Sequence, residues 1–181
     1  MAKTAKPGNG APPEDEVPVV APPESNEPAA AQPQPAGQPS MRILGQYLKD
    51  LSFENPNAPQ SLAPQQNQPE IAVAVNVNAR TLGPNDYEIE LHLDAKATNQ
   101  EKVVFAAELL YAGVFRMENF PPNLLRPAIL IECPRMLFPF ARQILAEATR
   151  NGGFPPLTLD PIDFASMYQK RVAQQNQSAT A

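Results

Sequence analysis

The amino-acid sequence predicts an α+β fold: a four-stranded antiparallel sheet in Greek-key order, followed by helices that pack on one face of the sheet. Three observations lead to this prediction. Apolar, β-prone segments come first in the chain, helical apolar stripes come last, and short turn sequences join three of the strands. Strands grouped before helices are typical of α+β proteins, whereas a doubly wound sheet needs strands and helices to alternate.

The two ends of the chain differ from its middle in composition. Residues 1–40 contain 10 of the 23 prolines and no aromatic residue. Such a segment buries too little apolar area to offset the entropy of ordering, and a basic start without an apolar stretch is not a secretory signal. We expect residues 1–40 and 173–181 to be disordered tails and residues 41–172 to form one domain.

Four strands are predicted, over residues 42–54, 71–79, 87–97 and 103–115. The first two are joined by a long loop, 55–70, whose prolines interrupt sheet pairing. A loop of this length inside a domain is usually functional. Turn sequences at 83–86 and 98–101 join the other strands into hairpins. Three consecutive hairpin strands, with an earlier strand that returns over a long connection, form a Greek key.

The third and fourth predicted strands carry different patterns. The third alternates strictly, with apolar residues at odd positions and polar residues at even ones, as in a strand with one solvent-exposed face. The fourth is largely apolar on both faces, which indicates a central strand or one covered by a partner. Acidic residues recur at even positions, where we expect one anionic outer face that attracts a basic partner. They are Asp50, Glu54, Glu88, Glu90, Asp94 and Glu108.

The last third of the chain is predicted to be helical. Residues 121–122, both proline, can begin a helix that continues to about Glu132. Pro134 and Pro139 are expected to prevent one continuous helix, because proline lacks the backbone donor and clashes with the preceding turn.

Two further helical signals follow. Apolar residues recur at helical spacing over 136–148, and the glycines of 151–153 predict a left-handed stop. The last helix is expected to begin with Asp160 as its cap and Pro161 in its first position, with Asp163 completing the first turn.

Composition excludes several classes of protein. The chain has 14 basic and 19 acidic side chains, which argues against nucleic-acid binding, and no apolar run of about 18 residues predicts a membrane span. A single histidine, His92, and a single cysteine, Cys133, leave no histidine pair for catalysis and no zinc site of several His or Cys ligands. We therefore expect no enzyme, cofactor or bound metal, a solvated His92 and a packed, inert Cys133 thiol. Asp50 and Glu54 could form an acid–base pair, but a solvated strand face explains them as well.

Four segments of the chain resemble the SecB family of bacterial protein-export chaperones. They are LSFENPNAP at 51–59, LFPFAR at 137–142, GFPPLTL at 153–159 and PIDF at 161–164. The resemblance covers about residues 42–172, in order and with compatible spacing. The strand region 71–104 is similar in pattern more than in letters, and residues 1–40 lie outside the resemblance.

This resemblance implies a cytosolic, ATP-independent chaperone, a holdase, that keeps precursor proteins unfolded and delivers them to SecA, the ATPase of the translocase. It also implies a homotetramer, a dimer of dimers, with helices between two eight-stranded sheets. The segment of SecA that docks is a small, basic, zinc-binding C-terminal tail, so that zinc belongs to the partner.

By the same resemblance, three sets of residues have expected roles. Binding to SecA is expected at Asp50, Glu54 and Glu108. Contacts that hold the two dimers together are expected at Ala107, Leu109 and Tyr111, where this chain departs from the family in side-chain type. Preprotein binding is expected at Leu62, Phe105, Leu157, Phe164 and Tyr168.

Three alternatives stay open. A folded adaptor without chaperone activity would keep the acidic face but lack apolar grooves. A SecB-like chaperone dedicated to one client, such as an antitoxin, would bind a narrow range of clients. An uncharacterised hydrolase would need a polar pocket, for which the sequence offers no residues.

Overall fold

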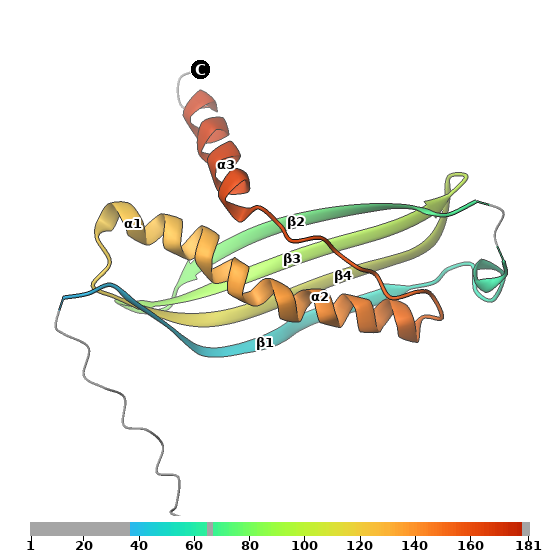
Figure 1. Cartoon of the computed structure of the whole chain (residues 1–181), viewed down its shortest axis with the longest axis horizontal. Helices are drawn as coiled ribbons and strands as arrows, with labels where there is room; N and C mark the ends of the chain where they lie inside the picture. Colours follow the sequence, from blue (N-terminus) through green and yellow to red (C-terminus); the bar gives the residue numbers. More distant parts are fainter. Residues whose placement is uncertain (1–36, 65–66, 179–181) are drawn as a thin grey trace, which may run out of the picture. The chain divides into compact units, whose positions relative to one another are not determined.

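Four long strands form an antiparallel sheet in the computed structural model of the protein, which describes residues 37–64 and 67–178. The strands are β1 (Ser40–Glu54), β2 (Glu70–Thr81), β3 (Asp86–Asn99) and β4 (Lys102–Glu118), and they lie in the order β1-β4-β3-β2 (Figure 1). β2, β3 and β4 follow one another as hairpins, and β1 lies beside β4. The predicted Greek-key order is therefore confirmed.

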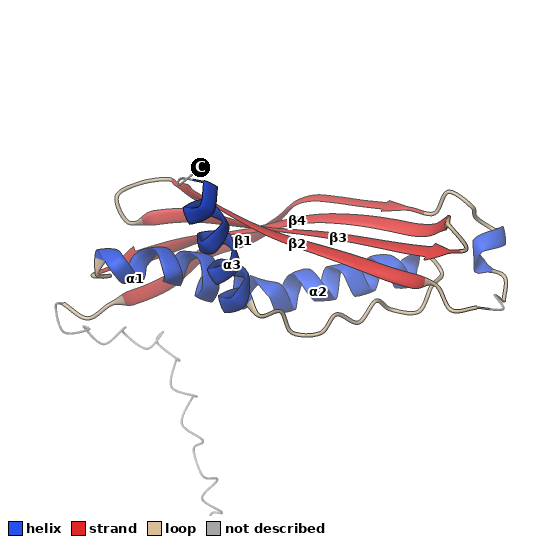
Figure 2. Cartoon of the chain, turned by 90° about the horizontal axis from the view of Figure 1, so that it is seen from above, coloured by secondary structure: helices blue, strands red, loops and turns tan. Residues whose placement is uncertain are grey.

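Helices follow the sheet, also as predicted. α1 (Pro122–Pro127), the π-helical segment η2 (Ala128–Glu132) and α2 (Cys133–Asn151) come directly after β4. α3 (Phe164–Ser178) ends the described chain, and a short 3₁₀ turn, η1 (Gln60–Leu62), lies in the loop between β1 and β2. Figure 2 shows α1 and α2 along one face of the sheet. None of the helices within 37–64 and 67–178 is long and apolar enough to cross a membrane.

The core forms between the sheet and α2. Leu93 of β3 and Leu109 of β4, both at odd positions, have no exposed surface and belong to one cluster with Leu137 and Leu145 of α2. Because side chains alternate along a strand, the even-numbered residues of β3 and β4 point to the opposite side. We call this side the outer face and the helix-covered side the helix face.

The prolines of the helical region do not break it. Helical backbone continues from Pro122 to Asn151, so the expectation that Pro134 and Pro139 prevent one continuous helix was wrong. Pro134 lies in the first turn of α2, where proline is well tolerated, and the π-helical η2 precedes it. Pro139 is exposed, whereas its neighbour Phe138 is buried against the core, and this packing offsets the missing backbone donor.

The last helix begins later and ends later than predicted. Asp163, not Asp160, is its cap, because the Asp163 carboxylate accepts the backbone N–H of Ser166 at 3.0 Å. α3 continues to Ser178, so residues 173–178, expected in the C-terminal tail, are helical. Glutamine, frequent there, is a good helix former. Residues 1–36 of the expected N-terminal tail lie outside the described residues.

Two irregularities in β1 decide which of its side chains reach the outer face. The register of β1 against β4 shifts by one residue at Leu44 and again at Lys49. Such a one-residue insertion in one strand of an antiparallel pair is a β-bulge. As a result Tyr47 and Asp50, three positions apart, both lie opposite outer-face residues of β4.

Candidate functional site

Three predicted acidic residues come together on the outer face. The β1–β4 register places Ser52 directly opposite Glu108, and Asp50 and Glu54 lie two positions to either side of Ser52. Four residues of a strand span about 13 Å, so Glu108 lies beside the middle of this span. All three acids are exposed. We call Asp50, Glu54 and Glu108 the acidic patch.

No lysine or arginine forms an ion pair with the acidic patch within the part of the chain that the structure describes. The ion pairs found there do not involve Asp50, Glu54 or Glu108. Asp94 of β3 lies directly opposite Glu108 and adds a fourth carboxylate. Like charges in opposed positions destabilise a strand pair, so an approaching cation would relieve their repulsion.

The other half of the outer face is electrically balanced around Glu88. This carboxylate is buried and accepts hydrogen bonds from Tyr47, from Lys49 at 3.3 Å and from Arg80 at 2.7 and 3.0 Å. The Tyr47 hydrogen bond is the largest cause that lowers the pKa of Glu88 to about 2; burial opposes it, and Arg80 and Lys49 reinforce it. Lys49 also pairs with Glu90 at 2.5 Å.

These ion pairs correct one expectation. The six even-numbered acids do share the outer face, but Glu88 and Glu90 are neutralised by Lys49 and Arg80 and do not extend its negative charge. Sequence reasoning missed Tyr47 and Lys49, because strict alternation assigns both to the helix face and only the bulge at Lys49 brings them outward.

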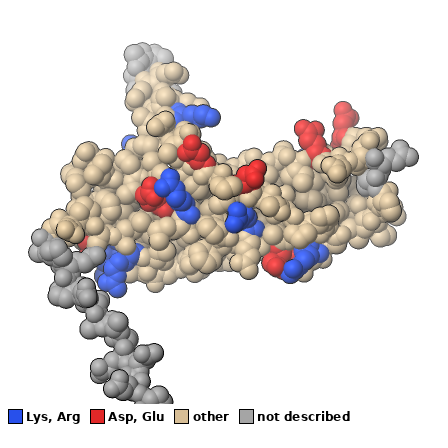
Figure 3. Space-filling view, in the orientation of Figure 1, with Lys and Arg blue, Asp and Glu red and all other residues tan. Residues whose placement is uncertain are grey.

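Apolar side chains remain exposed along β1 and the neighbouring surface of α2. The largest, each 39–47% exposed, are Leu44, Leu48, Leu51, Met136 and Phe140, and we call these five residues the edge stripe. A cavity of about 390 Å³ lies between β1, β4 and α2, lined in part by Leu51 and Phe140. Figure 3 looks on the helix face, where charged side chains are scattered and no single sign covers the surface. Exposed apolar groups that follow one edge indicate a contact surface.

The three residues expected between dimers lie inside the core of their own chain. Ala107, Leu109 and Tyr111 are on the helix face of β4, and each has less than a tenth of its surface exposed. Tyr111 reaches the cavity beside the edge stripe, whereas Ala107 and Leu109 offer no free surface in a single chain. Their interface role stays a prediction.

The five expected preprotein-binding residues fall in separate places. Phe105 is buried and its ring packs on Phe53 and Phe154, with ring centroids 5.8 and 5.1 Å away. Leu62, half exposed at the end of η1, approaches Gly153, whose φ of +88° confirms the predicted left-handed stop after α2.

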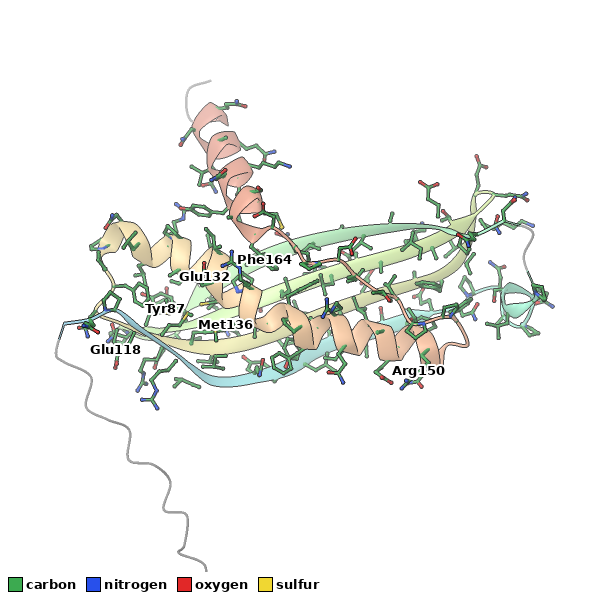
Figure 4. All side chains as sticks on the ribbon, viewed as in Figure 1. Tyr87, Glu118, Glu132, Met136, Arg150 and Phe164 are labelled. Atoms are coloured by element: carbon green, nitrogen blue, oxygen red, sulfur yellow. The ribbon has the colours of Figure 1, made fainter. Side chains whose placement is uncertain are left out.

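The other members lie away from this aromatic cluster. Phe164, labelled at the start of α3 in Figure 4, lines with Tyr168, Met167 and Leu130 a cavity of about 420 Å³ between α3, η2 and β2. We call it the α3 cavity. Leu157 is buried in the segment that connects α2 to α3. The role of all five residues in client binding stays a prediction.

The single histidine and the single cysteine lie where the sequence predicts. His92 is on the outer face, partly exposed, with its Nε2 atom 3.5 Å from Asp94 Oδ1. Cys133 is buried at the start of α2, with its sulfur 3.5 Å from the sulfur of Met41. Burial, assisted by the charge of Glu132, raises the pKa of the Cys133 thiol to about 12. The expectation of a packed thiol is therefore confirmed, and the raised pKa agrees with the expectation that it is inert.

Residues 34–175 match the sequence model of a protein family described as preprotein translocase subunit SecB. A protein-export protein SecB of Afipia carboxidovorans is 58% identical over 140 residues, which cover 77% of this chain and 87% of the relative. A protein-export protein SecB of Rhodopseudomonas palustris (strain BisB18) is 52% identical over 174 residues, which cover 96% of this chain and 94% of the relative.

A solved structure is similar in fold. It is the SecB-like chaperone Rv1957 of Mycobacterium tuberculosis, in complex with a ChAD peptide from the HigA1 antitoxin. The TM-score is 0.55 at 15% sequence identity, and the match covers 67% of this chain and 90% of that chain. At this identity the likeness concerns the fold alone.

Proposed function

The chain belongs to the SecB family, and from this membership we propose that it is a protein-export chaperone that holds precursor proteins unfolded and passes them to the translocase ATPase SecA. Binding needs no ATP, because burial of apolar surface is favourable, reversible and non-directional. One apolar surface can therefore accept many client sequences in proportion to the area they bury. The observation that carries the proposal is the separation of the acidic patch from the exposed apolar surfaces of the chain.

Clients bind to the apolar surfaces on the helix side of the sheet. Tyr168 and Met167 line the α3 cavity, and their flexible or amphipathic side chains adapt to different client residues. Leu62, which is half exposed and lies beside Gly153, offers a second contact site next to the Phe154 end of the aromatic cluster. An unfolded precursor exposes several apolar segments and can occupy both sites at once, which raises its overall affinity.

A refolding assay tests the holdase function. The full chain, in excess, should slow the refolding of several unrelated denatured precursors in the absence of ATP. Tyr168→Ala should weaken this delay by reducing apolar contact area, whereas Tyr87→Ala, a change on β3 outside the α3 cavity, should leave it nearly intact. A chain that delays no precursor, or delays all of them only when ATP is added, would refute the proposal.

The acidic patch is the docking site for a basic segment of SecA. Asp50, Glu54 and Glu108 present negative charge without a lysine or arginine partner in the described chain. Electrostatic complementarity of this kind accelerates encounter and selects the partner. Because the patch lies on the outer face, docking leaves the α3 cavity accessible to a client.

Charge reversal separates the two binding activities. Glu108→Lys should weaken SecA binding, and wild-type binding should fall as salt rises, because salt screens exposed charges. Glu70→Lys, at an exposed acid near the start of β2, is the matched control and should change SecA binding little. Client binding should survive in both variants. Loss of both activities in Glu108→Lys would indicate misfolding or one shared site, and unchanged SecA binding would remove the patch from the mechanism.

The chain assembles into a homotetramer, and the edge stripe supplies surface for contact between copies. β1 is an edge strand with free backbone groups, and a second copy could cover both this edge and the exposed leucines. Light scattering should give four times the 19.7 kDa of one chain. Leu48→Asp should reduce that mass, because burial of an unpaired carboxylate is costly.

The control for this change is Leu82→Asp, at a leucine that is 48% exposed but lies outside the edge stripe. The mass of this variant should stay that of the wild type. Leu109→Asp is unsuitable as a test of the interface, because Leu109 has no exposed surface in its own chain and the variant would disturb the core. A stable wild-type monomer at micromolar concentration would refute the tetramer.

The alternatives make different predictions. A chaperone dedicated to an antitoxin would delay one client and ignore unrelated precursors, and an adaptor would bind SecA without delaying any client. The relatives that share 52–58% identity are protein-export proteins, whereas the likeness to the antitoxin-bound chaperone concerns the fold. We place the protein in the cytoplasm, where precursors and SecA meet.

A further inference from the structure

One histidine and two carboxylates meet on the outer face. His92 and Asp94 lie two positions apart on β3 and point to the same side. Glu108 lies directly opposite Asp94 on β4. One possible ligand atom from each residue lies within 4.8 Å of the other two. The atoms His92 Nε2 and Asp94 Oδ1 are 3.5 Å apart.

Among residues 37–64 and 67–178 no lysine or arginine forms an ion pair with these groups, although Lys96, two positions beyond Asp94 on β3, lines one cavity with Asp94 and Glu108. The ion pairs described there leave Asp94 with His92 alone and Glu108 with none. The β3–β4 register has no shift at this point, so the opposed carboxylates cannot move apart along the strands. Their repulsion is relieved if a cation binds between them.

From this geometry we propose that His92, Asp94 and Glu108 bind a zinc ion. Zinc takes imidazole nitrogen and carboxylate oxygen at about 2.0–2.2 Å in a tetrahedral arrangement, which places ligand atoms about 3.3 Å apart. The His92–Asp94 pair is already close to this separation. Glu108 is exposed, so rotation of its side chain can close the remaining gap. Water takes the fourth position.

The imidazole distinguishes this group from an ordinary cluster of surface acids. Magnesium and calcium prefer ligands that are all oxygen, whereas imidazole suits zinc and its neighbours among the transition metals. A search of the sequence for several His or Cys ligands overlooks such a site, because Asp94 and Glu108 come from different strands and meet only through the sheet register.

The site does not depend on the proposed export function, since it is tested on the chain alone. Glu108 also belongs to the acidic patch. A bound dication would therefore reduce the negative charge that the patch offers to a basic partner. If zinc does not bind, the docking proposal is unaffected; if docking fails, the zinc site is unaffected.

Calorimetric titration of the full-length chain with zinc chloride is the direct test. We expect one zinc per chain with a Kd of about 1–10 μM, weaker than a four-ligand structural site because only three exposed ligands contribute. His92→Ala and Glu108→Gln should each raise the Kd at least about tenfold, since even changes behind the ligands cost about 10–100-fold. Glu70→Gln, which removes an exposed carboxylate outside the site, should bind zinc as the wild type does.

The single histidine also gives a spectroscopic test. The chain has one imidazole, so its proton resonances can be followed without assignment, and they should shift on addition of zinc but not of an equal concentration of magnesium. Circular dichroism confirms that each variant is folded. Wild-type binding weaker than about 100 μM, equal zinc affinity in His92→Ala, or equal losses in Glu70→Gln and Glu108→Gln would each overturn the proposal.

Discussion

The buried carboxylate of Glu88 stabilises the sheet, and its removal has a cost that the structure predicts. Glu88 of β3 bonds to Tyr47 and Lys49 of β1 and to Arg80 of β2, so one side chain connects three strands across the outer face. Glu88→Gln removes the charge but keeps the size of the side chain. Arg80 and Lys49 then face a neutral amide that accepts fewer and weaker hydrogen bonds.

The pKa of Glu88 gives the size of the effect. The pKa falls from its ordinary 4.5 to about 2 in the folded chain. A shift of that size is worth about 3 kcal/mol, because each pKa unit corresponds to about 1.4 kcal/mol. Since folding lowers this pKa, the stabilisation is fully present above about pH 4.5 and is lost as the pH falls towards about 2.

Urea denaturation at fixed protein concentration measures the difference. At pH 7, Glu88→Gln should lower the free energy of unfolding by about 3 kcal/mol. Between pH 4.5 and 2 it should lose less stability than the wild type, although Asp86 and Asp163, whose pKa values are also lowered, still contribute. Glu90→Gln is the matched control, because its partly exposed pair with Lys49 is worth less than about 1 kcal/mol. A Glu88→Gln chain within about 0.5 kcal/mol of the wild type, with the same acid sensitivity, would contradict the reasoning.

Two further predictions concern the region where α2 ends. Gly152→Ala should destabilise the fold by about 1–3 kcal/mol in thermal denaturation, because the new Cβ would lie 2.3 Å from the ring of Phe53. Gly45→Ala, with open space around the new Cβ, should be nearly neutral, and equal effects would exclude the clash as the cause. Thr149→Val should cost about 1–3 kcal/mol, because the buried Thr149 hydroxyl accepts the backbone N–H of Leu157 at 2.9 Å. Thr149→Ser keeps that bond and should retain more of the stability than Thr149→Val does.

The fold was largely predictable because its strands carry strong local signals. The strict alternation from Tyr87 to Ala97 identifies β3, its odd residues from Ile89 to Ala97 are buried, and the turn sequences on either side set the hairpins. The acidic patch was also predictable, because its three residues all have even numbers. The antiparallel register of β1 and β4 at these residues pairs even positions of one strand with even positions of the other and so brings them to one face. What was predictable is therefore what depends on local periodicity.

The parts that the sequence did not predict depend on packing between distant elements. Pro139 predicts the end of a helix, yet the burial of Phe138 and Ala141 on either side keeps the backbone of α2 helical. The network around Glu88 requires Tyr47 to face outward, which reverses the alternation of β1, and nothing in the local sequence marks a bulge there. The same limit applies to the group of His92, Asp94 and Glu108, which exists only through the β3–β4 register.

The two bulges of β1 have a consequence for how this strand can change in evolution. Each bulge adds one residue to β1. At both ends of the strand odd-numbered residues therefore lie opposite helix-face residues of β4, whereas between Leu44 and Lys49 even-numbered residues do so. Deletion of the extra residue at either bulge, Leu44 or Lys49, would make the flanking pairs consecutive and restore regular pairing with β4. Asp50 and Glu54 would still lie opposite outer-face residues of β4, and Met41 and Ile43 opposite helix-face residues. β1 can therefore become one or two residues shorter without turning its outward acids to the other side of the sheet.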